Sequence, residues 1–263
     1  MMDPIWASTQ LFWTFLVVLF RIGGLMVTAP VFGSPSVPVP VKLGFSTAFA
    51  LALTPTALGR VGTPPGDWLL LVGILLGETL VGMLIGYLVS LFFSAVQMAG
   101  AFLDMQVGYG IYQLMNPFAP APASLLAQFH TLLLMVVYLQ VNAHHWLLAA
   151  LAESFQAVPV GGVALDAARL QPLLSTVIAQ VFLLALRIAA PATAVLIVVD
   201  AALAIVSRAV PQMPVFFVGA PAKIAMGLIT LAIVLPLVAN VFVNTLPLAA
   251  QEVLNLLRAL TKP

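Results

Sequence analysis

The sequence predicts an all-α, polytopic protein of the membrane type, with about six long apolar helical segments. Three observations predict this class. Hydrophobic residues make up 63% of the 263 residues, charged residues make up only 6%, and the mean hydropathy is +1.17. The apolar residues gather in long runs, which polar or proline-rich segments separate. A membrane-spanning helix needs roughly 20 apolar residues, so a chain of this length has room for about six spans.

The apolar runs have uneven lengths. They cover approximately 11–29, 43–58, 69–97, 125–150, 173–206 and 224–246, and a C-terminal helix is expected over about 248–260. The third and fifth runs exceed a hydrocarbon core of roughly 30 Å, whereas the second is barely long enough. Steep tilting, helices broken at Pro191 and Pro236, or burial in a protein assembly would each accommodate these lengths.

The N-terminal segment should remain as the first helix, because it carries Asp3 and no Lys or Arg before Arg21, unlike a cleavable signal. Loop charges give little preferred orientation, since six spans would divide the cations almost equally between the two sides. One side would hold Arg60, Arg169, Arg258 and Lys262, and the other Lys42, Arg208 and Lys223. We therefore expect partner subunits to place the chain.

Several classes of function have no support in the sequence. The net charge of +1 leaves no basic stripe for nucleic acid, and the absence of cysteine excludes disulfides and thiolate metal sites. His130 would lie about 20 Å along a helix from His144, and the adjacent His144 and His145 would diverge by about 100°. No metalloprotease, hydrolase, nucleotide-binding or dinucleotide-binding motif occurs. We expect no enzymatic activity, cofactor or metal.

Glycines in the third run predict close helix packing. Gly73 with Gly77, and Gly82 with Gly86, lie one helical turn apart, and small residues at this spacing let helix backbones approach. The two pairs are about 140° out of phase, which implies two close neighbours. The alternative is that glycine is simply frequent in membrane helices.

Ionisable residues within the apolar runs or at their edges are functional candidates, because burying a charge is costly. They are Arg21, Glu78, Asp104, Arg187, Asp200, Arg208 and Lys223. We expect Glu78, Asp104, Arg187 and Asp200 to be buried and paired, while a proton relay through Glu78 or Asp104 is the alternative. Asp200 and Arg208 lie too far apart on a straight helix to pair, so each should have another partner.

The first irregular segment lies between Ala99 and Ser124. Gly100, Gly108 and Gly110 loosen its backbone, and three prolines between 117 and 122 end any helix. Its bulky apolar and aromatic residues indicate a deformable plug or constriction, with an ordinary interfacial connection as the alternative. The candidate plug residues are Met105, Tyr109, Ile111, Tyr112, Met115 and Phe118.

The second irregular segment covers sixteen residues, Arg208–Lys223. Pro211, Pro214 and Pro221 should forbid a continuous helix there, so the segment predicts a shaped chain reversal. The residues expected at its tip for contact with partners are Arg208, Pro211, Gln212, Met213, Pro214 and Lys223. Of these, Arg208 and Lys223 would cap helix carbonyl groups or contact acidic partner residues.

Four blocks of the sequence, in this order, resemble a known family. They are FRIGGLMVTAPVFGSPSVPVPVK (Phe20–Lys42), AGAFLDMQVGYG (Ala99–Gly110), VNAHHWLLAALAESFQAVP (Val141–Pro159) and RAVPQMPVFFVGAPAKIAMG (Arg208–Gly227). These blocks resemble the FliR family of flagellar type III export-gate subunits, which is related to the T component of injectisomes. The resemblance spans almost the whole chain.

This resemblance implies a single export-gate domain over 1–263, with a P-like portion over about 1–170 and a Q-like helical hairpin and C-terminal helix over about 171–263. It implies assembly with the P and Q subunits (FliP and FliQ) into a pore in the bacterial inner membrane, at the flagellar basal body. The segment Met105–Pro122 would help to plug the lumen. The reversal would lie at the cytoplasmic entrance, near the export-switch protein FlhB.

Exported flagellar proteins and membrane lipid are the other partners that the resemblance implies. Three alternatives stay open at this point: a small proton-coupled secondary transporter that uses Glu78, Asp104 and Asp200, an injectisome export-gate subunit, and a purely structural membrane scaffold.

Overall fold

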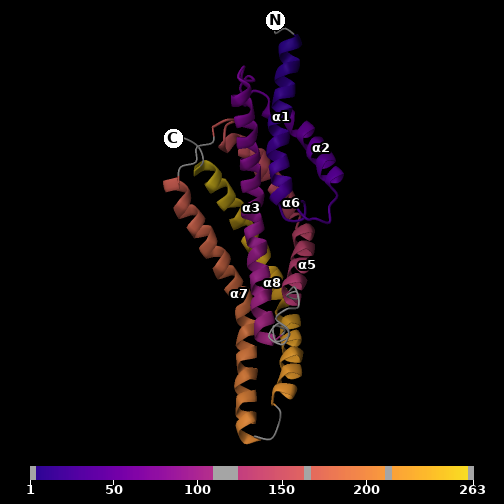
Figure 1. Ribbon diagram of the computed structural model, residues 1–263, viewed down its shortest axis with the longest axis vertical. Helices are drawn as coiled ribbons and strands as arrows, with labels where there is room; N and C mark the ends of the chain where they lie inside the picture. Colours follow the sequence, from indigo (N-terminus) through magenta and orange to yellow (C-terminus); the bar gives the residue numbers. More distant parts are fainter. Residues whose placement is uncertain (1–3, 109–123, 163–166, 211–214, 260–263) are drawn as a thin grey trace. The chain divides into compact units, whose positions relative to one another are not determined.

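The structure, a computed structural model, describes residues 4–108, 124–162, 167–210 and 215–259. These residues form seven α-helices and no strand (Figure 1), which confirms the predicted all-α class. The helices are α1 (Pro4–Thr28), α2 (Val39–Ala57), α3 (Trp68–Val107), α5 (Leu125–Gln140), α6 (Ala143–Ala157), α7 (Ala167–Ala209) and α8 (Val215–Ala259).

Among the described residues, four helical segments are long and apolar enough to cross a membrane. They are Ser8–Thr28, Trp68–Val107, Gln171–Ala209 and Pro221–Thr245, and the broken pair of α5 and α6 would raise the number to five if it formed one span. The sequence indicated about six. Part of the difference lies in α2, whose 19 residues include Lys42 and four hydroxyl residues.

Prolines do not break the two longest helices. α7 continues through Pro191, and α8 continues through Pro221 and Pro236. The predicted stop at Pro221 is therefore wrong, and the interruption after Arg208 is shorter than predicted because α8 already begins at Val215. An interior proline costs about 3 kcal/mol. In apolar surroundings, however, unwinding the neighbouring turns would leave several backbone groups unpaired, so the helix persists.

The fourth apolar run breaks where no proline stands. α5 ends at Gln140 and α6 begins at Ala143, and Asn142 between them has a φ of 54°. Asparagine enters this left-handed region more readily than most residues, because its short polar side chain can form local hydrogen bonds. The run is therefore divided between two helices, the second of which extends to Ala157.

The chain forms two compact units, each built from segments that are distant in sequence. Unit 1 contains Met1–Leu91, Asn142–Ile178 and Leu246–Pro263, and unit 2 contains Phe92–Val141 and Ala179–Thr245. The predicted division near residue 170 does not follow these units. The predicted division rests on the resemblance of two portions of the chain to different gate subunits. Such a resemblance does not depend on which residues contact each other, so the division stays a prediction.

In unit 1, glycines bring the backbones of α1 and α3 together. A Cβ atom at Gly82 would overlap the carbonyl oxygen of Arg21, and one at Gly24 would overlap the carbonyl oxygen of Thr79. A Cβ at Gly86, one turn after Gly82, would also meet α1. Small residues allow such close contact between apolar helices. The contact fixes the register of α1 on α3.

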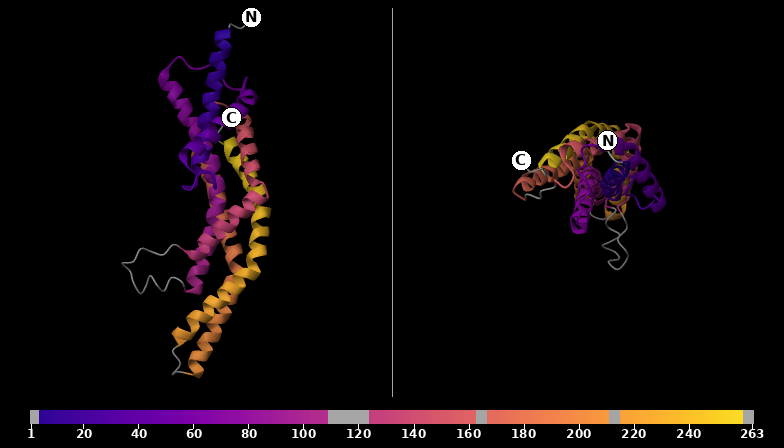
Figure 2. Two further views of the ribbon diagram at one scale, coloured as in Figure 1. Left: turned by 90° about the vertical axis from the view of Figure 1, so that its right-hand side faces the viewer. Right: turned by 90° about the horizontal axis from the view of Figure 1, so that it is seen from above.

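In unit 2, parts of α3, α5, α7 and α8 share a core. Its buried apolar side chains are Leu103, Val107, Leu126, Ala192, Leu196 and Leu231. Phe93 packs edge-on against Tyr138 and Phe242, with ring centroids 5.4 and 5.7 Å apart. Figures 1 and 2 show the unit 2 parts of α7 and α8 running side by side as an antiparallel hairpin. This hairpin carries the charged residues Asp200 and Lys223.

Replacing Gly82 by alanine should lower the free energy of unfolding by about 1–3 kcal/mol, because the added methyl group overlaps the α1 backbone. Gly73→Ala is the matched control, since Gly73 lies on the same helix and has no atom within 4 Å of a Cβ position. It should be neutral, or stabilising by up to about 1 kcal/mol, because alanine favours the helix. Thermal unfolding of the purified chain in detergent measures both. Equal melting temperatures for the two variants would contradict the packing described for Gly82.

Candidate functional site

Arg21 and Glu78 form an ion pair inside unit 1 that solvent does not reach. Nε of Arg21 donates to Oε2 of Glu78 at 2.6 Å, and both side chains are 0% exposed. The other guanidinium nitrogens donate to Oγ of Ser154 at 3.0 Å and to the carbonyl oxygen of Val158 at 3.1 Å. The guanidinium carbon also lies 4.0 Å from the centroid of the Phe155 ring. The positive charge therefore has a carboxylate, two further acceptors and an aromatic face.

This cluster ties α1, α3 and α6 together. The second carboxylate oxygen of Glu78 accepts a hydrogen bond from the backbone N–H of Gly161 at 3.4 Å. Glu78 was one of the residues predicted to be buried and paired, and this is where the structure places it. Sequence reasoning did not identify its partner, because Arg21 is 57 residues away and no spacing links the two. Ser154 and Phe155 were missed for the same reason.

Asp104, near the end of α3, caps the N-terminus of α5. Its carboxylate accepts hydrogen bonds from the hydroxyl of Ser124 and from the backbone N–H of Leu126, the latter at 3.3 Å. The Ser124 oxygen in turn accepts from the N–H of Ala127 at 3.1 Å. A carboxylate is favourable here because the first N–H groups of a helix lack intrahelical acceptors. The partners of Asp104 are thus a hydroxyl and a helix N-terminus, and not the predicted side chain of opposite charge.

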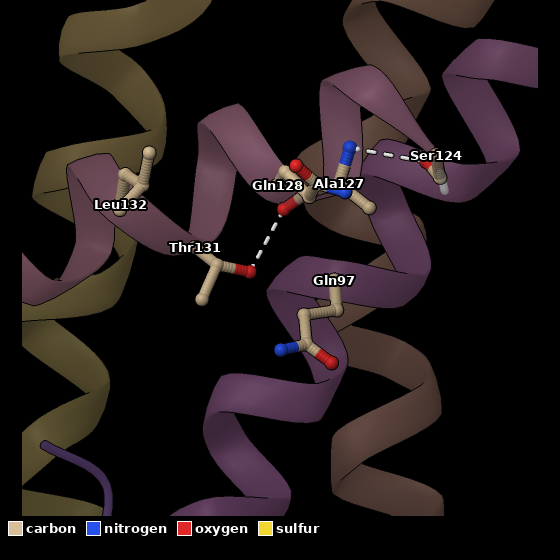
Figure 3. Close-up of a pocket in the computed structure, with 6 residues that line it drawn as sticks. All are labelled: Gln97, Ser124, Ala127, Gln128, Thr131 and Leu132. Carbon is tan, nitrogen blue, oxygen red and sulfur yellow. Dashed lines mark hydrogen bonds between the residues drawn. The ribbon is translucent and has the colours of Figure 1, made fainter. Parts of the chain in front are cut away.

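A pocket of about 370 Å³ lies beside this cap (Figure 3). It is lined by Gln97, Ser124, Ala127, Gln128, Thr131 and Leu132. The Thr131 hydroxyl donates to the carbonyl oxygen of Ala127 at 2.8 Å, so it serves the α5 backbone. The lining offers amide and hydroxyl groups but no ionisable side chain. The described part of the chain contains no group of three or more His, Asp or Glu residues that could hold a metal ion.

The predicted plug segment starts later than the sequence indicated. α3 continues through Gly100 to Val107, so Met105 lies on a helix, where it is 77% exposed. Gly100 permits a close approach and not a flexible loop, because a Cβ there would lie 2.7 Å from the backbone nitrogen of Ala127. The other predicted plug residues, Tyr109, Ile111, Tyr112, Met115 and Phe118, lie outside the described residues.

The α7–α8 hairpin carries a second ion pair. Nζ of Lys223 lies 2.7 Å from Oδ1 of Asp200, and the two side chains are 21% and 47% exposed. Lys223, predicted at the tip for contact with partners, thus binds an acid of its own chain, and Asp200 is not buried as predicted. Arg208 lies exposed in the last turn of α7. The remaining predicted tip residues, Pro211, Gln212, Met213 and Pro214, lie outside the described residues.

Arg187 is exposed, contrary to the prediction that it is buried and paired. The buried side of α7 around it consists of Leu184, Ala185, Ile188 and Ala189. At about 100° per residue, Arg187 points roughly 130° away from the centre of that side. It makes no ion pair or hydrogen bond with the described residues.

The predicted glycine pairs differ in their surroundings. Gly82 and Gly86 meet α1, whereas Gly73 is exposed with open space at its Cβ position and Gly77 is half-buried. A second close neighbour for α3 stays a prediction. The sequence analysis did not identify Gly24 as a packing residue. The signal that could have identified it is the pair of adjacent glycines, Gly23 and Gly24, within an apolar run.

Comparison with known proteins identifies the family. The sequence matches the family model for bacterial export proteins, family 1, over residues 12–248. The chain belongs to this family. It is similar to the flagellar biosynthetic protein FliR of Bacillus subtilis strain 168, with 35% identity over 94% of this chain and 96% of that protein. It is also similar to FliR of Escherichia coli K12, with 29% identity over 84% of each chain.

The secretion system apparatus protein SsaT of Salmonella typhimurium is 29% identical over 65% of this chain and 64% of its own length. The resemblance inferred from the four sequence blocks is thus confirmed. The family is one of export proteins and is not a known enzyme family. Together with the apolar helices, membership of this family indicates a membrane-embedded export protein.

Replacing Arg21 by methionine should destabilise the protein by about 3–5 kcal/mol, because Glu78 would remain buried without its counter-charge. The double variant Arg21→Met/Glu78→Gln should recover much of this loss, since no buried charge is left. Unfolding of both variants is measured in detergent. The control is Asp200→Asn at the partly exposed Asp200–Lys223 pair, which should cost less than the loss of Arg21. A double variant no more stable than the single one would show that charge compensation is not what holds the cluster.

Proposed function

We propose that this chain is a core subunit of the flagellar type III protein export gate, which assembles with the P and Q subunits (FliP and FliQ) into a channel for unfolded flagellar proteins. The flagellar system is supported by the relatives named FliR, which match over most of their length. The injectisome relative matches a smaller share of both chains, so an injectisome gate subunit is the weaker alternative.

The observation that carries the assembly proposal is the length of the apolar helices. α3, α7 and α8 have 40, 43 and 45 residues, which corresponds to about 60–68 Å at 1.5 Å per residue. This is roughly twice the thickness of a hydrocarbon core. Upright helices of this length in lipid would leave apolar turns in water. Packing against other helical subunits would cover those turns at any height.

The exposed apolar side chains support the same proposal. Met105 is 77% exposed, Ile233 is 73% exposed and Trp68 is 71% exposed, and they lie on three different stretches of helix. Soluble proteins rarely expose large apolar areas, so such areas mark surfaces that lipid or another protein covers. In the proposed gate, the P and Q subunits cover much of this area.

The proposed mechanism makes and breaks no covalent bond. Residues from Met105 to Pro122 contribute to an apolar plug that limits the leakage of water and ions while the gate is idle, and an unfolded substrate displaces it. Asp104 would hold together the helix ends that flank this segment. The segment from Arg208 to Lys223 would lie at the cytoplasmic entrance near FlhB, with the gate in the inner membrane at the flagellar basal body.

The composition of the complex is the first test. Native mass spectrometry of the tagged chain, co-expressed with its P and Q partners and extracted in mild detergent, should show a defined hetero-oligomer with one copy of this chain. A stable homo-oligomer that binds neither partner would contradict the gate. It would favour a secondary transporter that uses Glu78, Asp104 and Asp200 as coupling residues.

The plug gives a second prediction. Replacing Met105, Tyr109 and Met115 by glycine should increase ion conductance of the assembled gate in planar bilayers, because less apolar volume obstructs the lumen. Ile233→Gly is the control for the cost of a glycine in an exposed helical position, about 1 kcal/mol, since Ile233 is as exposed as Met105 but lies on α8. Unchanged conductance in the triple variant would count against the plug.

A further inference from the structure

On one face of α7, Arg187 is the one charged side chain between Leu183 and Val198. Arg187 lies within the apolar segment Gln171–Ala209, about 24 Å from its start and about 33 Å from its end. Large apolar side chains are exposed on both sides of it along the helix. Leu183 and Leu186 are 53% and 54% exposed, and Ile197 and Val198 are 55% and 67% exposed. Between Leu183 and Val198, exposed apolar side chains therefore flank the charge in both directions.

We propose that this face of α7 docks an apolar helix of a neighbouring gate subunit that carries an aspartate or glutamate level with Arg187. The inference rests on the proposed function, because it takes the neighbour to be another gate subunit. A guanidinium that loses its water in an apolar contact needs an anion, and a carboxylate can accept two parallel hydrogen bonds from it. Ala190 and Ala194 are also exposed. Their small side chains leave room for the backbone of the partner helix beside the charge.

A lipid headgroup fits this position less well. Headgroup phosphates lie at the membrane surface, and an arginine side chain reaches them only from near the end of a membrane-embedded stretch. If Arg187 stood at the surface, either the side chains that precede it, such as Leu183, or those that follow it, such as Ile197, would stand in water. A protein partner covers both sets at once, so the position of the charge favours protein over lipid.

A second copy of this chain fits less well too. The acid on the same helix, Asp200, lies about 140° around α7 from Arg187. Two antiparallel α7 helices could therefore not bring Arg187 and Asp200 of both copies into one interface. Asp200 also already binds Lys223. An α7–α7 contact between two copies thus does not supply the carboxylate.

The experiment compares Arg187→Glu, Arg187→Leu and Arg60→Glu, each co-expressed with the P and Q partners. Arg60→Glu is the matched control, because Arg60 is also exposed but lies outside α7. The measurement is the amount of each partner recovered per tagged chain. We expect a loss of roughly tenfold or more for Arg187→Glu, a smaller loss for Arg187→Leu and none for Arg60→Glu. Each variant expressed alone should melt like the wild type, because Arg187 bonds to no described residue.

A charge-reversal screen then identifies the acid. Aspartate and glutamate residues in the apolar helices of the partners are replaced one at a time by arginine and combined with Arg187→Glu, and one combination should restore recovery to near the wild-type level. Recovery of the partners by Arg187→Glu at the wild-type level would overturn the proposal. The proposal would also be overturned if no acid-to-arginine replacement in the partners restored their recovery by the Arg187→Glu variant.

The wild-type chain separates this inference from the proposed function. If the wild-type chain recovers neither partner, the proposed gate assembly fails. The docking face is then tested by itself: a photo-reactive amino acid replaces Ala190 in cells, and the molecules that crosslink to it are identified. A crosslink to a protein helix with an acid level with Arg187 would support the docking face. Crosslinks only to lipid, to a second copy of this chain, or to a helix without an acid would overturn it.

Discussion

An ionised side chain inside an apolar protein needs a partner, because removing its water costs several kcal/mol that only opposite charge and hydrogen bonds offset. The described chain meets this constraint internally at several places, among them the Lys223–Asp200 pair of the α7–α8 hairpin. Arg21 and Glu78 neutralise each other in unit 1, and Asp104 binds the N-terminus of α5 in unit 2. Arg187 has no such partner among the described residues. The charges of Arg21, Glu78 and Asp104 hold helices of this chain together. In our proposal, Arg187 pairs with another molecule.

Helix packing and ion pairing depend on each other in unit 1. In lipid, burying apolar surface gives helices little reason to associate, so close packing and polar contacts must hold them together. Gly82 lets the backbone of α3 approach the carbonyl oxygen of Arg21, and this approach brings the arginine side chain within 2.6 Å of Glu78. A larger residue at Gly82 would displace α1 and lengthen that hydrogen bond. The glycine contact is therefore a condition for the ion pair.

The sequence was informative about the helical class and less so about partners and breaks. Long apolar runs predict helices because backbone N–H and C=O groups in apolar surroundings must be hydrogen-bonded within the segment. The same rule lets α8 continue through Pro221. By contrast, the break at Asn142 occurs in a run where no proline stands. The rarity of buried charge singled out Glu78, yet its partners depend on which distant segments meet. Arg187 was predicted inside because charges in apolar helices usually face a protein interior. For Arg187, the interior that this rule requires is supplied by another subunit in our proposal.

The length of the helices bears on how the chain is placed in the membrane. Helices of about 60 Å or more have no single depth at which lipid covers them. In the proposed gate, such a chain gains its placement from the surfaces that it shares with neighbouring subunits. Partner binding also stabilises a fold by mass action, because the partner binds the folded chain and not the unfolded chain. In our proposal, exposed apolar faces such as that around Arg187 therefore belong to an interface that completes both the placement and the stability of the chain.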